Sequence, residues 1–169
     1  MHFERGGVPF WRRVSFLRYC LGGGGLLIVA VLVGLMTLTP TPVDQGRVEL
    51  IKQLLSWLHD HGVPQWFGYH KLEFTANIVM FVPLGFFIAL LLPLRSAWLG
   101  GVVGMLASMF VELTQLFALP GRVASVLDVL ANSVGGWVGV GIAVLLRLAV
   151  ASRDRALLRR EHAGASAGV

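Results

Sequence analysis

The stretch from residue 96 to residue 146 constrains the fold most, because it is almost entirely apolar. It is interrupted by the sequence Pro-Gly-Arg at 120–122, which predicts a tight turn. About 20 apolar residues in a helix cross the hydrocarbon core of a bilayer. The stretch therefore predicts a hairpin of two membrane-spanning helices, over residues 96–119 and 126–146.

Two further apolar segments precede this hairpin. Residues 19–38 and 74–94 contain no charged side chain, and a helix of either length reaches about 30 Å, the thickness of a bilayer core. The first is long for a signal peptide and lacks a small-x-small cleavage site, so we expect it to be retained. With 56 % hydrophobic and 14 % charged residues, the 169-residue chain is predicted to be an all-α membrane protein with four transmembrane helices.

The connection over residues 39–73 is predicted to carry an amphipathic helix. Apolar residues recur there at helical spacing, at Val48, Ile51, Leu54, Leu55 and Leu58. With charged residues on the other face, this pattern favours a helix lying at the membrane surface over a soluble helix packed on its own domain. The loop also holds three histidines whose spacing matches no standard metal site, so neither a metal nor another cofactor is predicted.

The distribution of basic residues predicts the orientation in the membrane. Residues 1–18 hold four arginines, the tail over 147–169 holds five, and Arg95 lies between the second and third spans. The 39–73 loop is balanced, with three basic and four acidic residues. The positive-inside rule therefore places both termini in the cytoplasm. The net charge of +5 is thus assigned to membrane orientation and not to nucleic-acid binding, and the Ala/Gly/Ser end of the tail is expected to be disordered.

Polar side chains gather around the predicted 120–122 turn. They are Asn77, Glu112, Gln115, Arg122, Asp128 and Asn132. Ser108, Glu112 and Gln115 share one face of the third helix, and Asp128 and Asn132 share one face of the fourth. The hairpin should bring the two faces to similar depth near the outer surface. Ionisable groups within a membrane span are costly, so the cluster is a candidate functional site.

Three interpretations of this cluster stay open. Glu112 and Asp128 are candidate catalytic carboxylates, one kept protonated by burial and the other ionised near Arg122. The same groups could instead bind an ionic head group, with Arg122 holding a phosphate or carboxylate and Asn77, Gln115 and Asn132 orienting the ligand. Alternatively, Glu112 is a structural clamp that fixes the helix pair. No nucleophile is predicted, because Ser108, Ser125 and Ser133 are interpreted as packing residues.

Small residues form stripes on the predicted spans. Gly100, Gly104 and Ser108 recur at four-residue intervals, and Gly135 and Gly139 repeat the pattern on the fourth span. Such stripes allow close helix contact. They support a second hypothesis, in which the protein is a non-enzymatic scaffold or a partner subunit. The partner in this hypothesis can be a second copy of the chain, which would make a homo-oligomer. A small transporter is a third hypothesis, disfavoured because no inverted repeat is present.

The polar residues also form an ordered set of motifs. These are Asn77-x3-Phe81-x-Pro83-x-Gly85, Glu112-x2-Gln115, and Gly121-Arg122-x5-Asp128-x3-Asn132-x2-Gly135. Over residues 70–146 the set resembles the VanZ-like family of small multi-pass bacterial membrane proteins, named for a protein associated with teicoplanin resistance. The resemblance implies a cytoplasmic (inner) membrane protein. We expect its outward-facing polar cleft to bind, or to modify, a lipid-linked envelope precursor or a lipoglycopeptide.

Overall fold

The computed structural model describes residues 10–37, 48–118 and 125–166, and these residues form helices and short connections with no strand. The helices are α1 (Phe10–Thr37), α2 (Val48–Asp60), α3 (Tyr69–Leu91), the 3-10 turn η1 (Leu94–Ser96), α4 (Leu99–Ala118) and α5 (Val126–Ser166). Four of them contain segments long and apolar enough to cross a membrane: Arg18–Met36, Tyr69–Leu91, Leu94–Phe117 and Val126–Leu157. The predicted all-α architecture with four spans is confirmed.

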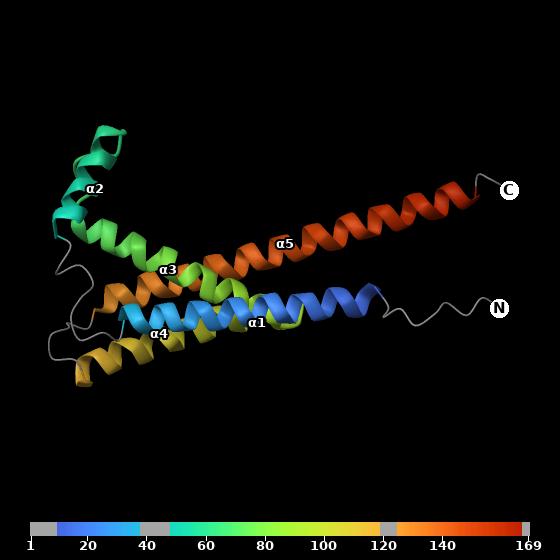
Figure 1. The fold of residues 1–169 in the computed structure, drawn as a ribbon, viewed down its shortest axis with the longest axis horizontal. Coiled ribbons are helices and arrows are strands. Elements are labelled where there is room, and N and C mark those ends of the chain that lie inside the picture. The colour runs from blue at the N-terminus through green and yellow to red at the C-terminus, as the bar shows by residue number, and fades with distance from the viewer. Residues whose placement is uncertain (1–9, 38–47, 119–124, 167–169) are drawn as a thin grey trace.

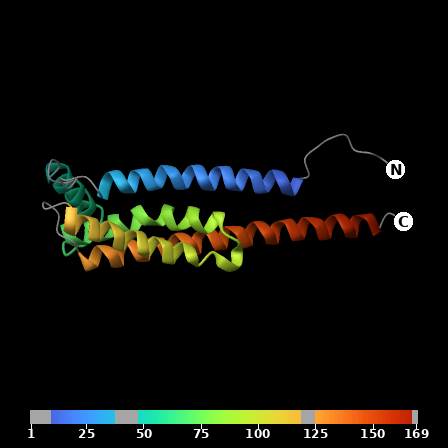
Figure 2. The ribbon, with the colours of Figure 1, turned by 90° about the horizontal axis from the view of Figure 1, so that it is seen from below.

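The four long helices run side by side in alternating directions, and α2 stands apart from them (Figure 1). The most extensive packing is between α3 and α5; α4 packs on both, and α1 packs on α3. The Phe10 end of α1 and the Ser166 end of α5 lie at the same end of the bundle (Figure 1). Figure 2 shows α5 projecting well beyond the other helices at that end.

Glycines bring α3 and α5 into backbone contact. A Cβ atom added at Gly135 would overlap the carbonyl oxygen of Ile78, and one added at Gly139 would overlap that of Val82. Helices in lipid associate by close packing, because lipid tails are as apolar as side chains and provide no hydrophobic drive between helices. The glycines of α5 therefore determine which face of this helix meets α3.

Two glycines of α1 have a similar role. A Cβ atom at Gly25 would collide with the ring of Phe87, and one at Gly22 would lie 2.8 Å from a methyl carbon of Leu91. Gly23 and Gly24 have open space around them. The glycine run at residues 22–25 is thus helical, and two of its four glycines leave space into which side chains of α3 pack.

The helix boundaries differ from the prediction at two places. α3 begins at Tyr69, five residues before the predicted start at 74. The prediction covers only the uncharged run, but a helix can continue through charged residues where it lies in water or among lipid head groups. α5 continues unbroken to Ser166, so the expectation of disorder in the tail is wrong for residues 163–166. The tail is rich in Ala, Leu and Arg, which are strong helix formers. At 41 residues α5 is about 60 Å long, roughly twice the hydrocarbon thickness of a bilayer.

The predicted amphipathic segment forms the helix α2, and none of its residues is buried. The helix ends at Asp60, and two residues later Gly62 has a φ of 96°, the left-handed conformation that glycine adopts without strain. The turn is joined to the following segment by a contact of 3.1 Å between His59 Nε2 and the Phe67 carbonyl oxygen. α2 is thus a helix without a buried residue, and its place at the membrane surface stays a prediction.

Candidate functional site

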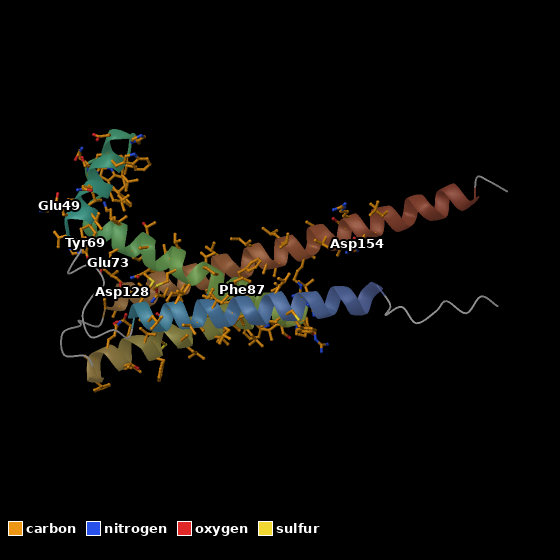
Figure 3. The ribbon with its side chains drawn as sticks, viewed as in Figure 1. Glu49, Tyr69, Glu73, Phe87, Asp128 and Asp154 are labelled. Carbon is orange, nitrogen blue, oxygen red and sulfur yellow. The ribbon has the colours of Figure 1, made fainter. Side chains whose placement is uncertain are left out.

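The candidate site is a set of polar side chains at the end of the bundle where α3 and α5 begin and α4 ends. We define the polar cluster as Asn77, Ser108, Glu112, Gln115, Ser125, Asp128 and Asn132. Figure 3 shows Asp128 at the same end of the molecule as Glu73 and Tyr69 of α3. Four members are buried: Ser108 is 0 % exposed, Glu112 7 %, Gln115 5 % and Asn132 3 %. Buried polar atoms in native proteins nearly always have hydrogen-bond partners, so each needs an account.

Asn77 and Asp128 connect α3 to α5. The Asn77 Nδ2 group donates a hydrogen bond of 2.8 Å to Asp128 Oδ1, and both residues are half-buried. A carboxylate acceptor makes this bond stronger than one between two neutral groups. The contact lies about two turns inside α3 and in the first turn of α5, so it fixes the two helices at the end that carries the cluster.

Glu112 lies against the first turn of α5. The backbone N–H of Ser125 donates a hydrogen bond of 2.7 Å to Glu112 Oε2. Ser125 directly precedes α5, and its own carbonyl accepts bonds from the backbone N–H groups of Asp128 and Val129. A carboxylate at a helix N-terminus is stabilised by the helix dipole and by the free N–H groups there. This contact offsets part of the cost of a buried glutamate.

Ser108 and Asn132 form the deepest pair. Asn132 Nδ2 donates a hydrogen bond of 2.9 Å to Ser108 Oγ, joining α4 to α5 one turn below Glu112. The other half of the amide, Asn132 Oδ1, is buried and has no hydrogen-bond partner among the described residues. A buried acceptor left unsatisfied costs about 1–3 kcal/mol. Reversing the amide would leave Nδ2 unsatisfied instead, so one hydrogen-bonding position stays open in either orientation.

The predicted site residues are brought together unequally. Asn77 and Asp128 are hydrogen-bonded to each other, and Glu112 accepts a hydrogen bond from the backbone of Ser125. Gln115 is buried on the same face of α4 as Glu112, one turn nearer the end of the helix. Arg122, the predicted anion-binding residue, lies outside the described residues, as does the 120–122 turn.

The polar roles of two members of the cluster are not predicted by the sequence. Ser108 is interpreted there as a packing residue, but its hydroxyl oxygen accepts the bond from Asn132. Its spacing of four residues from Glu112 places both side chains on one face, as predicted, but does not identify the partner of the hydroxyl. Ser125 contributes through its backbone, and the only hint in the sequence is that serine favours the position before a helix. Ser133 bonds the Val129 carbonyl of its own helix and takes no part in the cluster.

The small-residue stripes serve contacts within the chain. Gly104 faces Gly136, with 3.7 Å between a Cβ built on the former and the Cα of the latter. A Cβ at Gly100 would lie 3.1 Å from a methyl carbon of Val140, while Gly135 and Gly139 are covered by α3. These faces are occupied by helices of the same molecule, so the scaffold hypothesis loses the surface on which it was based.

The described histidines have local contacts. His61 stacks on Trp57, with ring centroids 4.2 Å apart, and His70 lies 3.9 Å from the carboxylate of Glu73. Within the described ranges, no group of three or more His, Cys, Asp or Glu side chains is arranged to hold a metal ion.

Comparison with known proteins assigns most of the chain. The model of the VanZ/LLP1 family matches residues 26–147. The match extends from α1 into α5 and begins well before residue 70, where the sequence motifs start. No curated protein and no solved structure gave a significant match.

Proposed function

This chain belongs to the VanZ/LLP1 family, and we propose that it is a bacterial cytoplasmic-membrane protein whose polar cluster binds an amphipathic ligand of the cell envelope. Its four apolar helices place much of its surface in contact with lipid. The observation that supports binding is the unsatisfied Asn132 amide beside three other buried polar residues. Polar and ionisable residues within membrane spans lower stability, and those that are present commonly have a function.

We propose that the polar cluster faces outward. The described ends of α1 and α5 lie together (Figure 1), and nine of the 14 lysines and arginines of the chain lie in residues 1–18 and 147–169, the segments that carry those ends. The positive-inside rule assigns such an end to the cytoplasm. The opposite end, which carries the polar cluster and α2, then faces the periplasm or the exterior.

The chemistry of the cluster supports a ligand that donates hydrogen bonds. In the amide orientation that bonds Ser108 through Nδ2, the open atom Asn132 Oδ1 is an acceptor, and the ionised forms of Glu112 and Asp128 are acceptors only. A lipid-linked precursor or a lipoglycopeptide has hydroxyl and amide N–H donors together with an acyl chain that stays in the bilayer. In this proposal Asn77, Gln115 and Asn132 orient the ligand, and Arg122 holds an anionic group on it.

The two carboxylates also support a catalytic extension of this proposal. Glu112 is buried and bonded to a backbone N–H, while Asp128 is half-buried and bonded to an amide. Two carboxyl groups in different surroundings can differ in protonation, as acid–base chemistry requires. Turnover of a ligand by the wild type, and its loss in Glu112→Gln with binding retained, would separate catalysis from binding.

We further propose that α2 lies on the outward-facing surface of the cytoplasmic membrane. Leu50, Leu54 and Trp57 are exposed, and Leu55 and Leu58 are half-buried. Trp66 nearby is covered on one side by the Lys71 ammonium, 3.8 Å from its ring centroid. Aromatic and basic side chains of this kind favour the interface. In a Cys20→Ser background, a spin label at Leu55 should be accessible to oxygen and one at Gln53 to a water-soluble nickel reagent. Equal accessibility to the nickel reagent would contradict this placement.

The function is tested in a teicoplanin-sensitive host that expresses the wild type, Glu112→Gln, Asp128→Asn or Gly141→Leu at matched membrane levels. Gly141 has open space around it, so its variant is the control for substitution within a span. We expect protection by the wild type and the control and its loss in both carboxylate variants. Protection that survives in the carboxylate variants would refute a role for the cluster, and no protection by the wild type would refute the link to teicoplanin.

A further inference from the structure

Two arginines from different helices converge at the end of the bundle opposite the polar cluster. Arg147 of α5 reaches the end of α3, where its Nη1 group donates hydrogen bonds to the carbonyl oxygens of Ala89, at 2.9 Å, and Leu92, at 2.8 Å. The last carbonyls of a helix lack partners within the helix, and a cation is favourable beside them. Arg147 therefore caps α3 from a neighbouring helix.

Arg18 of α1 is the second member. Its Nη2 group donates a 3.1 Å bond to the Tyr19 hydroxyl, but its Nε is buried and has no acceptor among the described residues. Gly22, one turn along α1 from Arg18, lies against Leu91, because a Cβ built on it would be 2.8 Å from a methyl carbon of that residue. Arg18 therefore lies beside the end of α3 that Arg147 caps, and the two positive charges repel each other there. The ion pairs between described residues, Lys52–Glu49 and His70–Glu73, involve neither arginine. The pair thus places two cations together without a described carboxylate to balance them.

The depth of the pair points to the chemistry of the missing anion. Arg18 is the first residue of the Arg18–Met36 span, and Leu92 directly follows the Tyr69–Leu91 span. Both therefore lie at the boundary of the hydrocarbon core, the level at which lipid head groups begin. Tyr19 is 52 % exposed there, as expected of an interfacial aromatic residue.

We propose that Arg18 and Arg147 bind the phosphate of an anionic phospholipid in the leaflet that faces the chain termini. Guanidinium groups are well suited to phosphate, because each presents a fork of N–H donors to the phosphate oxygens. Each has five N–H donors, and the bonds of Arg147 to α3 use only one of its nitrogens. The phosphate would accept from Arg18 Nε and relieve the repulsion between the two cations. The lipid would join α1 to α5 at this end.

The test is a lipid titration of the full-length protein in a neutral detergent, followed by native mass spectrometry. The probes are phosphatidylglycerol and diacylglycerol, with inorganic phosphate as the competitor. We expect tighter binding of phosphatidylglycerol than of diacylglycerol by the wild type. Arg18→Gln should weaken phosphatidylglycerol binding about tenfold, the equivalent of one charge-assisted hydrogen bond, and Arg18→Lys should weaken it less.

Arg155→Gln is the matched control. Arg155 is exposed on the same helix as Arg147, and its Nε bonds the Ala151 carbonyl of that helix, so we expect unchanged lipid binding. Equal losses in Arg18→Gln and Arg155→Gln, with unchanged melting temperatures, would reduce the effect to general surface charge and overturn the site. Displacement of the lipid by inorganic phosphate at equal concentration would overturn the lipid assignment in favour of a free phosphate.

Discussion

At the scale of single residues, three contacts of the polar cluster link different segments of the bundle. The Asn77–Asp128 and Ser108–Asn132 contacts each join two helices, and the Glu112–Ser125 contact joins α4 to the residue that precedes α5. A polar group in the hydrocarbon core has no water to bond, so it is stable there only with a protein partner. In Asn132 the Nδ2 group has such a partner and Oδ1 has none among the described residues. Substitutions at this residue can therefore test whether the amide serves stability or function.

We predict that the double variant Ser108→Ala/Asn132→Leu keeps its stability within about 1 kcal/mol, because both polar partners are removed together. Ser108→Ala alone should destabilise the protein by about 1–3 kcal/mol, since it leaves the buried amide without its bonded partner. Thermal unfolding in detergent measures both values. If the polar pair serves only stability, the double variant will retain wild-type protection in the susceptibility assay; we expect that protection to be lost.

At the scale of elements, the α3–α5 pair depends on glycine. The close approach leaves no room for a side chain at Gly139, whereas Gly141, two residues along the same helix, has nothing within 4 Å. A helix presents positions two residues apart in different directions, so one glycine faces α3 and the other does not.

Gly139→Leu should therefore separate α3 from α5 and destabilise the protein by about 3 kcal/mol or more, as expected for overpacking against backbone atoms. Gly141→Leu should be close to neutral. Melting temperatures of the two purified variants, compared at equal detergent concentration, provide the measurement. Equal melting temperatures would show that the α3–α5 contact is looser than the structure has it. Gly104 would not serve as the control, because it lies against Gly136.

At the scale of the whole molecule, the bundle has a polar end and a basic end. α2 lies at one end of the bundle, and the extended part of α5 lies at the other (Figures 1 and 2). The polar cluster lies at the end that carries α2, where Figure 3 labels Asp128. The Arg18–Arg147 pair lies at the opposite end, where α3 ends. If the polar end faces outward, a ligand from the envelope and a phospholipid of the inner leaflet would bind the same four helices from opposite sides.

This orientation predicts the behaviour of reporter fusions. Alkaline phosphatase inserted after Gly62 should be active, and alkaline phosphatase fused after Arg95 or after Val169 should be inactive, because the enzyme requires the periplasm to form its disulfides. Fluorescent-protein fusions at the same three positions should show the reverse pattern. An active phosphatase at Val169 would reverse the assigned orientation and place the polar cluster on the cytoplasmic side.

Local information was sufficient for the helices of this protein. Each apolar run had to become a helix, because only a helix satisfies every backbone hydrogen bond of a single segment within lipid. The four spans and the α2 segment could therefore be predicted from residue order alone, and the motifs around Asn77, Glu112 and Asp128 were sufficient for the family. The start of α3 and the end of α5 could not be predicted in this way. Where a helix continues past the membrane into water, its length depends on the helix propensity of its residues and no longer on their hydropathy.

The partners of the polar residues were decided by the tertiary structure. Periodicity placed Glu112 and Asp128 on inward faces, but the rotation of each helix about its axis determined that Asp128 meets Asn77 and that Glu112 meets Ser125. That rotation is set where Gly135 and Gly139 allow the backbones of α3 and α5 to touch. Contacts between distant segments depend on how the helices pack, and the spacing of residues along a single helix does not predict this packing.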